Sequence, residues 1–229
     1  ECQNLFFGLA RGSYNYGFNR GKNLRLLGGV TPDKDTLIKI HRAAFSLHLL
    51  LFCTYSLNTD IIFDRPNYCK LDLMTGMNRQ GKLFFQAGEA EAAQSMLKSK
   101  GWKTGLKGLI AETERIGVKF GLKLTATTDA KYLEIGTSTK SDNVDFLLGH
   151  LQREYGIQPQ DCCFCGDEFL EIDQGVPGSD SFMRTKRSAV GDFLDVSDAK
   201  GKRPDGVRQI GGGVEGFLSF LKEQEISVS

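Results

Sequence analysis

The chain has almost no net charge and no long uninterrupted apolar run. Its 29 Lys and Arg residues nearly balance 28 Asp and Glu residues, which leaves a formal charge of +1. This balance gives no global reason to expect nucleic acid or an anionic membrane as a partner. The short basic segment at residues 184–187 is expected to be a solvated loop. The longest apolar run, residues 47–53, is interrupted by His48 and is too short to span a bilayer. We therefore expect no nucleic-acid partner and no membrane partner.

The cysteines do not form a zinc-binding pattern. Cys2, Cys53 and Cys69 are isolated, and the other three lie together in residues 162–165. That cluster contains one Cys-x-x-Cys, and no second pair or His-x-His cluster completes four ligands. Free thiols that pack as small hydrophobic groups are the expected state, which suits a reducing, cytoplasmic compartment.

The first 135 residues show alternating helix and strand signals, and the chain is long enough for one large or two small domains. A helix start is predicted at residues 31–33: Thr31 can cap the helix, Pro32 suits its first position, and Asp33 is favourable at the positive end of its dipole. The remaining patterns predict strands at 49–52, 61–63, 68–74, 118–125 and 131–135, and helices at 88–100 and 105–116. Residues 1–135 are therefore predicted to form an α+β unit with a mainly antiparallel sheet.

The pattern changes near Gly136. A helix is predicted at 142–155, a strand at 162–165, another strand near 188–190, and a last helix from Val214. Strands that alternate with helices indicate parallel packing. We therefore predict an α/β fold in which residues 136–229 form the second unit.

Four carboxylates follow the apolar run at 162–165, within a loop rich in Gly and Pro: Asp167, Glu171, Asp173 and Asp180. A buried strand that ends in such a loop is typical of a Mg²⁺ or phosphate site in α/β proteins. Asp167 is the best candidate ligand. Asp180 is the preferred second acid, with Glu171 and Asp173 as rivals, and a solvated turn or a Ca²⁺ loop is the alternative.

Lys140 stands at the start of the helix predicted at 142–155. A cation is unfavourable there, because the helix dipole already places positive charge at its N-terminus. The position makes sense if Lys140 and the helix end together hold a phosphate. Taken alone, Lys140 would be an ordinary exposed lysine.

These motifs occur in the order found in a known family. Residues 132–183 resemble the C-terminal half of haloacid dehalogenase-like (HAD) phosphohydrolases, in the large α/β-cap branch that includes sugar phosphatases, sucrose-phosphate phosphatase and phosphomannomutase. The matching positions are Leu133-Glu134-Ile135, Lys140, Gly166-Asp167 and Asp180 with Met183. The resemblance implies the C-terminal half of a Rossmann-like core, with residues 1–135 as an α+β cap-like unit. It also implies hydrolysis of a small phosphorylated substrate, such as a sugar phosphate, with Lys140 contacting phosphate and Asp167 and Asp180 binding Mg²⁺.

The sequence departs from this family at the nucleophile, which is an Asp in an Asp-x-Asp motif. Asp33-Lys34-Asp35 has the spacing but lies at a helix start, where capping carboxylates are expected. The nucleophile is therefore unknown, and we expect a truncated or split phosphatase whose missing core half lies upstream or in a protein partner. The alternative is a catalytically inactive HAD-derived subunit with an interaction or structural role.

Overall fold

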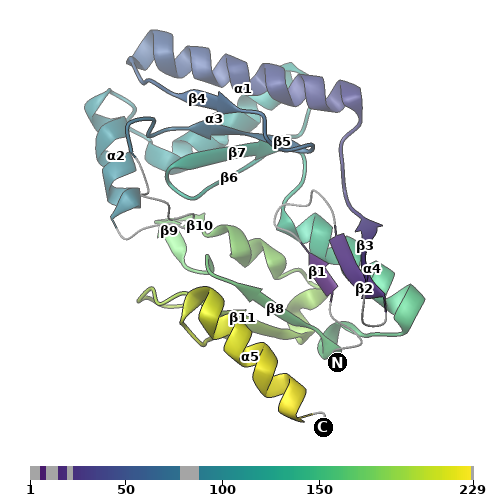
Figure 1. Ribbon diagram of the computed structural model, residues 1–229. Helices are drawn as coiled ribbons and strands as arrows, with labels where there is room; N and C mark the ends of the chain where they lie inside the picture. The colour runs from purple at the N-terminus through teal and green to yellow at the C-terminus, as the bar shows by residue number, and fades with distance from the viewer. Residues whose placement is uncertain (1–5, 9–14, 20–22, 78–87, 228–229) are drawn as a thin grey trace. The chain divides into compact units, whose positions relative to one another are not determined.

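The computed structural model describes residues 6–8, 15–19, 23–77 and 88–227, and these residues form two compact units. Unit 1 comprises residues 1–30, 140–170 and 179–229, and unit 2 comprises residues 31–139 and 171–178. Both parallel and antiparallel sheets are present, so the predicted α/β class is confirmed. Figure 1 shows the elements of each unit with their labels.

Unit 2 is built on a four-stranded antiparallel sheet in the order β4-β5-β7-β6. Its strands are β4 (Asp60–Ile62), β5 (Tyr68–Asp72), β6 (Thr125–Thr128) and β7 (Tyr132–Gly136). Helices α1 (Lys34–Tyr55) and α3 (Gly105–Lys119) pack on the sheet and on each other, and α2 (Glu89–Ser99) packs on α3. The core consists of fully buried apolar side chains from these elements, among them Leu47, Leu51, Leu106, Leu109, Leu71, Leu133 and Ile135.

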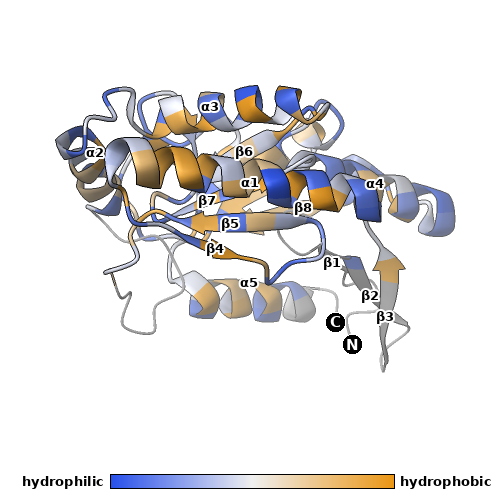
Figure 2. Ribbon diagram, turned by 90° about the horizontal axis from the view of Figure 1, so that it is seen from above, coloured by the Kyte–Doolittle hydropathy of each residue, from blue (hydrophilic) through white to orange (hydrophobic). Residues whose placement is uncertain are grey.

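Helix α1 has one buried and one exposed apolar face. Ile40, Ala44 and Leu47 are buried with the sheet, whereas Phe45 and Phe52 are about half exposed. Figure 2 looks onto this helix and shows hydrophobic residues along it. By length and composition alone α1 could cross a membrane, a test that the core helix of a soluble protein also passes. The apolar run that looked too short for a membrane is thus part of a 22-residue helix.

A short hairpin completes unit 2. Strands β9 (Glu171–Asp173) and β10 (Val176–Pro177) pair antiparallel around Gly175, which has a φ of +70°. That conformation favours glycine. Ile172 and Val176 of this hairpin belong to the hydrophobic core of unit 2.

Unit 1 contains a three-stranded parallel sheet in the order β12-β11-β8. The strands are β8 (Cys163–Gly166), β11 (Asp192–Asp195) and β12 (Val207–Gln209), and the helices are α4 (Lys140–Tyr155) and α5 (Gly213–Ser227). A second sheet, β1 (Phe6–Gly8), β2 (Asn15–Asn19) and β3 (Asn23–Gly28), is antiparallel. Phe193 packs between the rings of Phe164 and Phe169, with centroid distances of 4.9 and 6.2 Å.

Several sequence predictions differ from these elements. Residues 49–52 are the last part of α1 and not a strand, and residues 188–190 form a short 3₁₀ helix, after which strand β11 begins at Asp192. The units also differ from the predicted ranges 1–135 and 136–229 in two segments. Residues 1–30 group with the C-terminal unit, and residues 171–178 group with unit 2.

Among the residues that the structure describes, the cysteine prediction holds in part: Cys69 is buried as expected, whereas Cys53 and Cys163 are exposed. Cys53, Cys69, Cys162, Cys163 and Cys165 are free thiols. Cys163 and Cys165 alternate with Phe164 along β8, and their Sγ atoms lie 3.9 Å apart on one side of the strand. Cys2 lies outside the described residues.

Candidate functional site

The candidate site lies at the carboxyl ends of two neighbouring parallel strands of unit 1. β8 ends at Gly166, which pairs with Asp195 at the end of β11, and Asp167 follows directly. Ligand sites of open α/β sheets lie outside this edge of the strands. The same end of unit 1 holds a cavity of about 230 Å³ lined by Lys140, Asp167 and Asp180.

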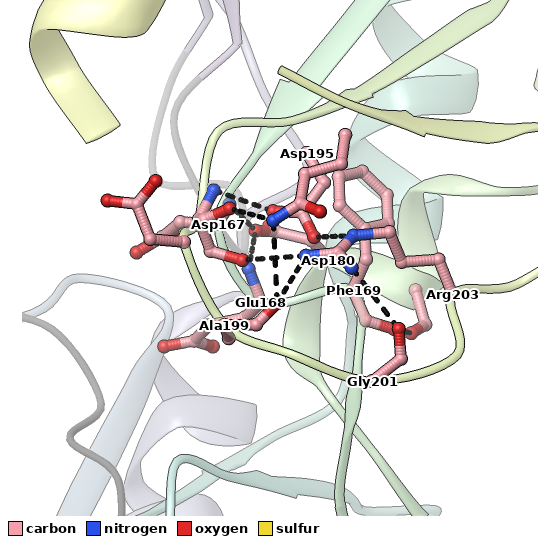
Figure 3. Close-up of polar contacts among 12 residues, drawn as sticks. Asp167, Glu168, Phe169, Asp180, Asp195, Ala199, Gly201 and Arg203 are labelled. Carbon is pink, nitrogen blue, oxygen red and sulfur yellow. Dashed lines mark hydrogen bonds and ion pairs between the residues drawn. The ribbon is translucent and has the colours of Figure 1, made fainter. Parts of the chain in front are cut away.

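Asp180 is held tightly by the chain around Asp167. One of its carboxylate oxygens, Oδ2, accepts the backbone N–H groups of Asp167 (2.8 Å) and Glu168 (2.9 Å), as Figure 3 shows. The Asp180 N–H in turn donates to the Glu168 carbonyl oxygen at 3.1 Å. The Asp180 side chain is only 6% exposed. The acidic loop is therefore an ordered turn that brings two carboxylates together.

Gly166 makes this arrangement sterically possible. A Cβ atom at position 166 would lie 2.3 Å from Oδ2 of Asp180, which is closer than any real contact. A side chain at this position would displace the Asp180 carboxylate from the two N–H groups that it accepts. The glycine before Asp167 is thus required by the position of Asp180.

Lys140 contacts the second of these carboxylates, that of Asp180. It is the first residue of α4, its amino group forms an ion pair with Asp180, and it donates to the Ser179 hydroxyl at 2.7 Å. The Ser179 hydroxyl donates to the Glu168 carboxylate at 2.6 Å. Three residues far apart in the sequence, Lys140, Asp167 and Asp180, therefore meet in one cavity.

The charges at this site are largely buried. Burial raises the pKa of the Asp167 carboxyl, the nearby Asp180 carboxylate raises this pKa further, and Lys140 opposes the shift. A raised carboxyl pKa means that the site disfavours a further negative charge unless a cation compensates it. Such an environment suits a cation-binding carboxylate.

The two carboxylates differ in what they can offer to a cation. Asp180 already uses Oδ2 for two N–H groups and Oδ1 for Lys140, whereas no described side chain hydrogen-bonds to the Asp167 carboxylate. No group of three or more His, Cys, Asp or Glu side chains suited to a metal occurs among the described residues. Mg²⁺ is usually held by one or two carboxylates with waters and substrate phosphate, whereas Ca²⁺ takes six to eight oxygen ligands. The donor set therefore fits Mg²⁺ better than Ca²⁺.

The other two predicted ligands, Glu171 and Asp173, are not among the residues that line this cavity. Glu171 and Asp173 lie on β9, which belongs to unit 2. Glu171 is exposed, and the Asp173 carboxylate accepts a hydrogen bond from Gln94. Between and after them, Ile172 and Val176 of the same hairpin pack in the core of unit 2.

Asp195 is a residue of this site that the sequence analysis missed. It is fully buried, and its carboxylate accepts the Ser197 N–H at 2.8 Å and the Arg203 Nε–H at 2.6 Å (Figure 3). Arg203 also donates to the carbonyl oxygens of Ala199 and Gly201, which fixes the loop after β11. In the sequence, the sign of this residue is an acid directly after the apolar pair Phe193-Leu194. It was missed because the strand was expected at 188–190, whereas β11 ends at Asp195.

Comparisons with known proteins assign no family to this chain. No family model matches it, and no curated protein matches it. Among solved structures it is similar to an N-terminally truncated Plasmodium falciparum IMP-nucleotidase (TM-score 0.45, 15% identity), covering 76% of this chain and 42% of that one. The ATP-bound enzyme gives a TM-score of 0.44 at 16% identity, with 75% and 35% covered. The present chain thus spans less than half the length of these proteins.

Proposed function

We propose that the chain is a Mg²⁺-dependent phosphohydrolase module of the HAD-like kind, acting on a small phosphorylated substrate such as a sugar phosphate. Asp167 is the principal metal ligand, Asp180 is the second acid, and Lys140 contacts the phosphate. The observation that carries this proposal is the meeting of Lys140, Asp167 and Asp180 in one cavity at the carboxyl ends of β8 and β11.

The chemistry of the three residues suits phosphoryl transfer. A magnesium ion at Asp167 would neutralise charge on a transferring phosphoryl group. Lys140, together with the positive end of the α4 dipole, supplies positive charge for phosphate oxygens. The hydrogen bonds from the Asp167 and Glu168 N–H groups hold Asp180 in place before a ligand arrives. Preorganised charges of this kind reduce the reorganisation that the reaction requires.

The nucleophile is proposed to come from another segment or chain. Asp33, the first acid of the Asp33-Lys34-Asp35 sequence, caps α1 by accepting the Thr36 N–H at 2.7 Å. It belongs to unit 2. This capping role favours a second candidate function, in which the chain is a catalytically inactive subunit that keeps the cation and phosphate site. Metal-dependent phosphate release by this chain alone, from a panel of sugar phosphates and nucleoside monophosphates, would rule out that second function.

The binding part of the proposal is tested by calorimetric titration with Mg²⁺ in the presence of inorganic phosphate. Asp167→Asn keeps the shape of the side chain and removes its charge, so we expect Mg²⁺ affinity to fall by at least about tenfold. Glu171→Gln is the matched control and should bind as the wild type does. Equal affinity of wild type and Asp167→Asn would remove Asp167 from the site and overturn the assignment.

A further inference from the structure

The outer face of α1, which points away from the core of unit 2, carries exposed apolar side chains. Four large ones are between 42% and 53% exposed: Ile38, Phe45, Leu49 and Phe52. Phe63, directly after β4, is 56% exposed and extends this face, because its ring centroid lies 4.5 Å from that of His41 on α1. Figure 2 shows the apolar stretches of the helix in orange. Apolar surface gathered on one face in this way is typical of interaction sites.

The aromatic rings of this face are already ordered. His48 stacks between Phe45 and Phe52, with centroid distances of 6.0 and 6.2 Å. The His48 ring is fixed in turn by a 2.7 Å hydrogen bond between its Nδ1 atom and the Thr59 hydroxyl. Side chains that are ordered before association lose little conformational entropy when a partner covers them. The outer face of α1 is therefore preorganised for packing.

The residues of this face are symmetric in position about Phe45. Ile38 and Phe52 lie seven residues before and after it, and His41 and Leu49 lie four residues before and after it. Two such helices packed antiparallel, with Phe45 on the two-fold axis, bring Ile38 of each copy against Phe52 of the other. A two-fold interface requires a surface that is complementary to itself, and the seven-residue spacing is that of helices packed along a common seam.

The distribution of charge along α1 favours the antiparallel arrangement. The first part of the helix, residues 34–42, has three basic residues and one acid: Lys34, Lys39, Arg42 and Asp35. Residues 43–55 contain no Lys, Arg, Asp or Glu. Parallel pairing would bring the two basic segments together. Antiparallel pairing instead lays each basic segment beside the last turn of the other helix, where the dipole is negative and no basic residue is present.

The exposed area of this face suits a second copy of the chain. A phenylalanine side chain presents about 200 Å², so exposed fractions of 52%, 53% and 56% leave about 300 Å² on Phe45, Phe52 and Phe63. A symmetric pair would therefore bury about 600 Å² of aromatic surface from the two copies. Ile38, Leu49 and the flanking side chains bring the total to about 1,000 Å², the lower bound for specific interfaces.

We propose that the outer face of α1 is a self-association surface, on which a second copy of this chain packs its own α1 antiparallel with Phe45 at the two-fold axis. The surface belongs to unit 2 and does not depend on the cation and phosphate site of unit 1. Because the interface is small, the dimer is reversible and dissociates on dilution.

Sedimentation velocity over chain concentrations from about 1 to 200 µM tests the proposal, with a thiol reductant present so that exposed cysteines cannot cross-link the copies. We expect the average mass to rise toward that of a dimer. Phe45→Lys places two like charges opposite each other at the axis, so the dissociation constant should rise at least about hundredfold. Circular dichroism checks that this variant is folded. Val118→Lys is the matched control, since Val118 is 72% exposed on α3 and outside this face.

The antiparallel register has a test of its own. Ile38→Lys and Phe52→Glu should each weaken self-association, and mixing the two variants should restore a heterodimer, because positions 38 and 52 of different copies meet. A mixture of Ile38→Lys with Phe52→Lys should stay monomeric. The proposal is overturned if the wild type is monomeric throughout, if Phe45→Lys dimerises as the wild type does, or if the first mixture does not recover. Binding of a monomeric wild type to phosphatidylcholine vesicles would assign the face to a membrane surface and would also overturn it.

Discussion

Position 166 must be a glycine because of where the Asp180 carboxylate lies. The Asp180 carboxylate occupies the space that a side chain at position 166 would fill, and two backbone N–H groups hold it there. The sequence analysis identified Gly166-Asp167 and Asp180 as a pair of motifs. Only the three-dimensional structure shows why the first motif needs its glycine.

Gly166→Ala should therefore damage the site without changing any charged residue. We expect the variant to lose about 1–3 kcal/mol of unfolding free energy, because the new methyl group displaces the Asp180 carboxylate. Mg²⁺ affinity should also fall, by about tenfold or more, because Asp180 loses its orientation. Urea denaturation measures the unfolding free energy, and calorimetry measures the Mg²⁺ affinity. Gly121→Ala gives the purely structural comparison, because Gly121 has open space around it but an unfavourable φ of +69°. A stable variant with unchanged Mg²⁺ affinity would contradict this account of Gly166.

The sequence could identify acidic candidates but could not choose among them. Asp180 was preferred on its family position, and it does share a cavity with Lys140 and Asp167. Glu171 is only four residues from Asp167 in the sequence, yet it lies on a hairpin whose Ile172 and Val176 side chains are packed in the core of unit 2. The spacing of these acids in the sequence cannot show that the chain leaves unit 1 after residue 170 and returns to it at residue 179.

At the scale of elements, the second half of α1 is a segment whose short apolar run predicts the wrong secondary structure. Residues 49–52 are a continuous apolar run, which was assigned to a strand, but Leu47 and Leu51 continue the buried face that begins at Ile40. Exposed Phe45, Leu49 and Phe52 make the helix apolar on its outer face too, which hides the usual amphipathic pattern. The helix begins near its predicted start, but the cap is Asp33 and not Thr31, and the first helical residue is Lys34 and not Pro32.

Asp33→Ala tests that cap and its pH dependence. The pKa of Asp33 is lowered in the folded protein because its carboxylate accepts the Thr36 N–H. A lowered folded pKa stabilises the fold above the unfolded value, and this stabilisation is lost as the pH falls through the folded pKa. Asp33→Ala should therefore lower the melting temperature at neutral pH, with a difference that shrinks once the pH falls below about 4.

Thermal unfolding followed by circular dichroism at several pH values measures this difference. Asp35→Ala is the matched control, since Asp35 lies in the first turn of α1 but is not the cap residue. A melting-temperature difference that stays constant down to acid pH would show that the Asp33 carboxylate does not stabilise the helix by this route.

At the scale of the whole molecule, the chain passes between the two units more often than the sequence predicts. The predicted change of architecture near Gly136 lies close to the passage into unit 1 at Lys140. The grouping of residues 1–30 with unit 1 could not be predicted, because it depends on a contact between distant residues. Asn15 and Asn143 exchange two amide hydrogen bonds, at 2.7 and 3.0 Å, and both side chains are buried.

Asn143→Ala should weaken the attachment of the β1–β2–β3 sheet to α4. The Asn15 Nδ2 still donates to the Gly28 carbonyl oxygen at 3.3 Å, but the Asn15 Oδ1 loses its Asn143 donor. Leaving this buried oxygen without that donor costs about 1–3 kcal/mol. Hydrogen exchange should become faster in strands β2 and β3, whereas the β5–β7 amides of unit 2 should keep their protection. Equal acceleration in both units would show that they unfold together, and no acceleration in β2 and β3 would show that the Asn15–Asn143 contact does not hold this sheet.

The central claim is that Asp167 and Asp180 hold a divalent cation beside Lys140. Paramagnetic broadening by Mn²⁺, used in place of Mg²⁺ on the ¹⁵N-labelled chain, locates such a cation directly. We predict that the amide signals of Gly166, Asp167, Glu168 and Asp180 broaden at the lowest Mn²⁺ concentrations, and that Asp167→Asn abolishes this effect. Broadening that centres instead on Glu171 and Asp173, and persists in Asp167→Asn, would contradict the claim.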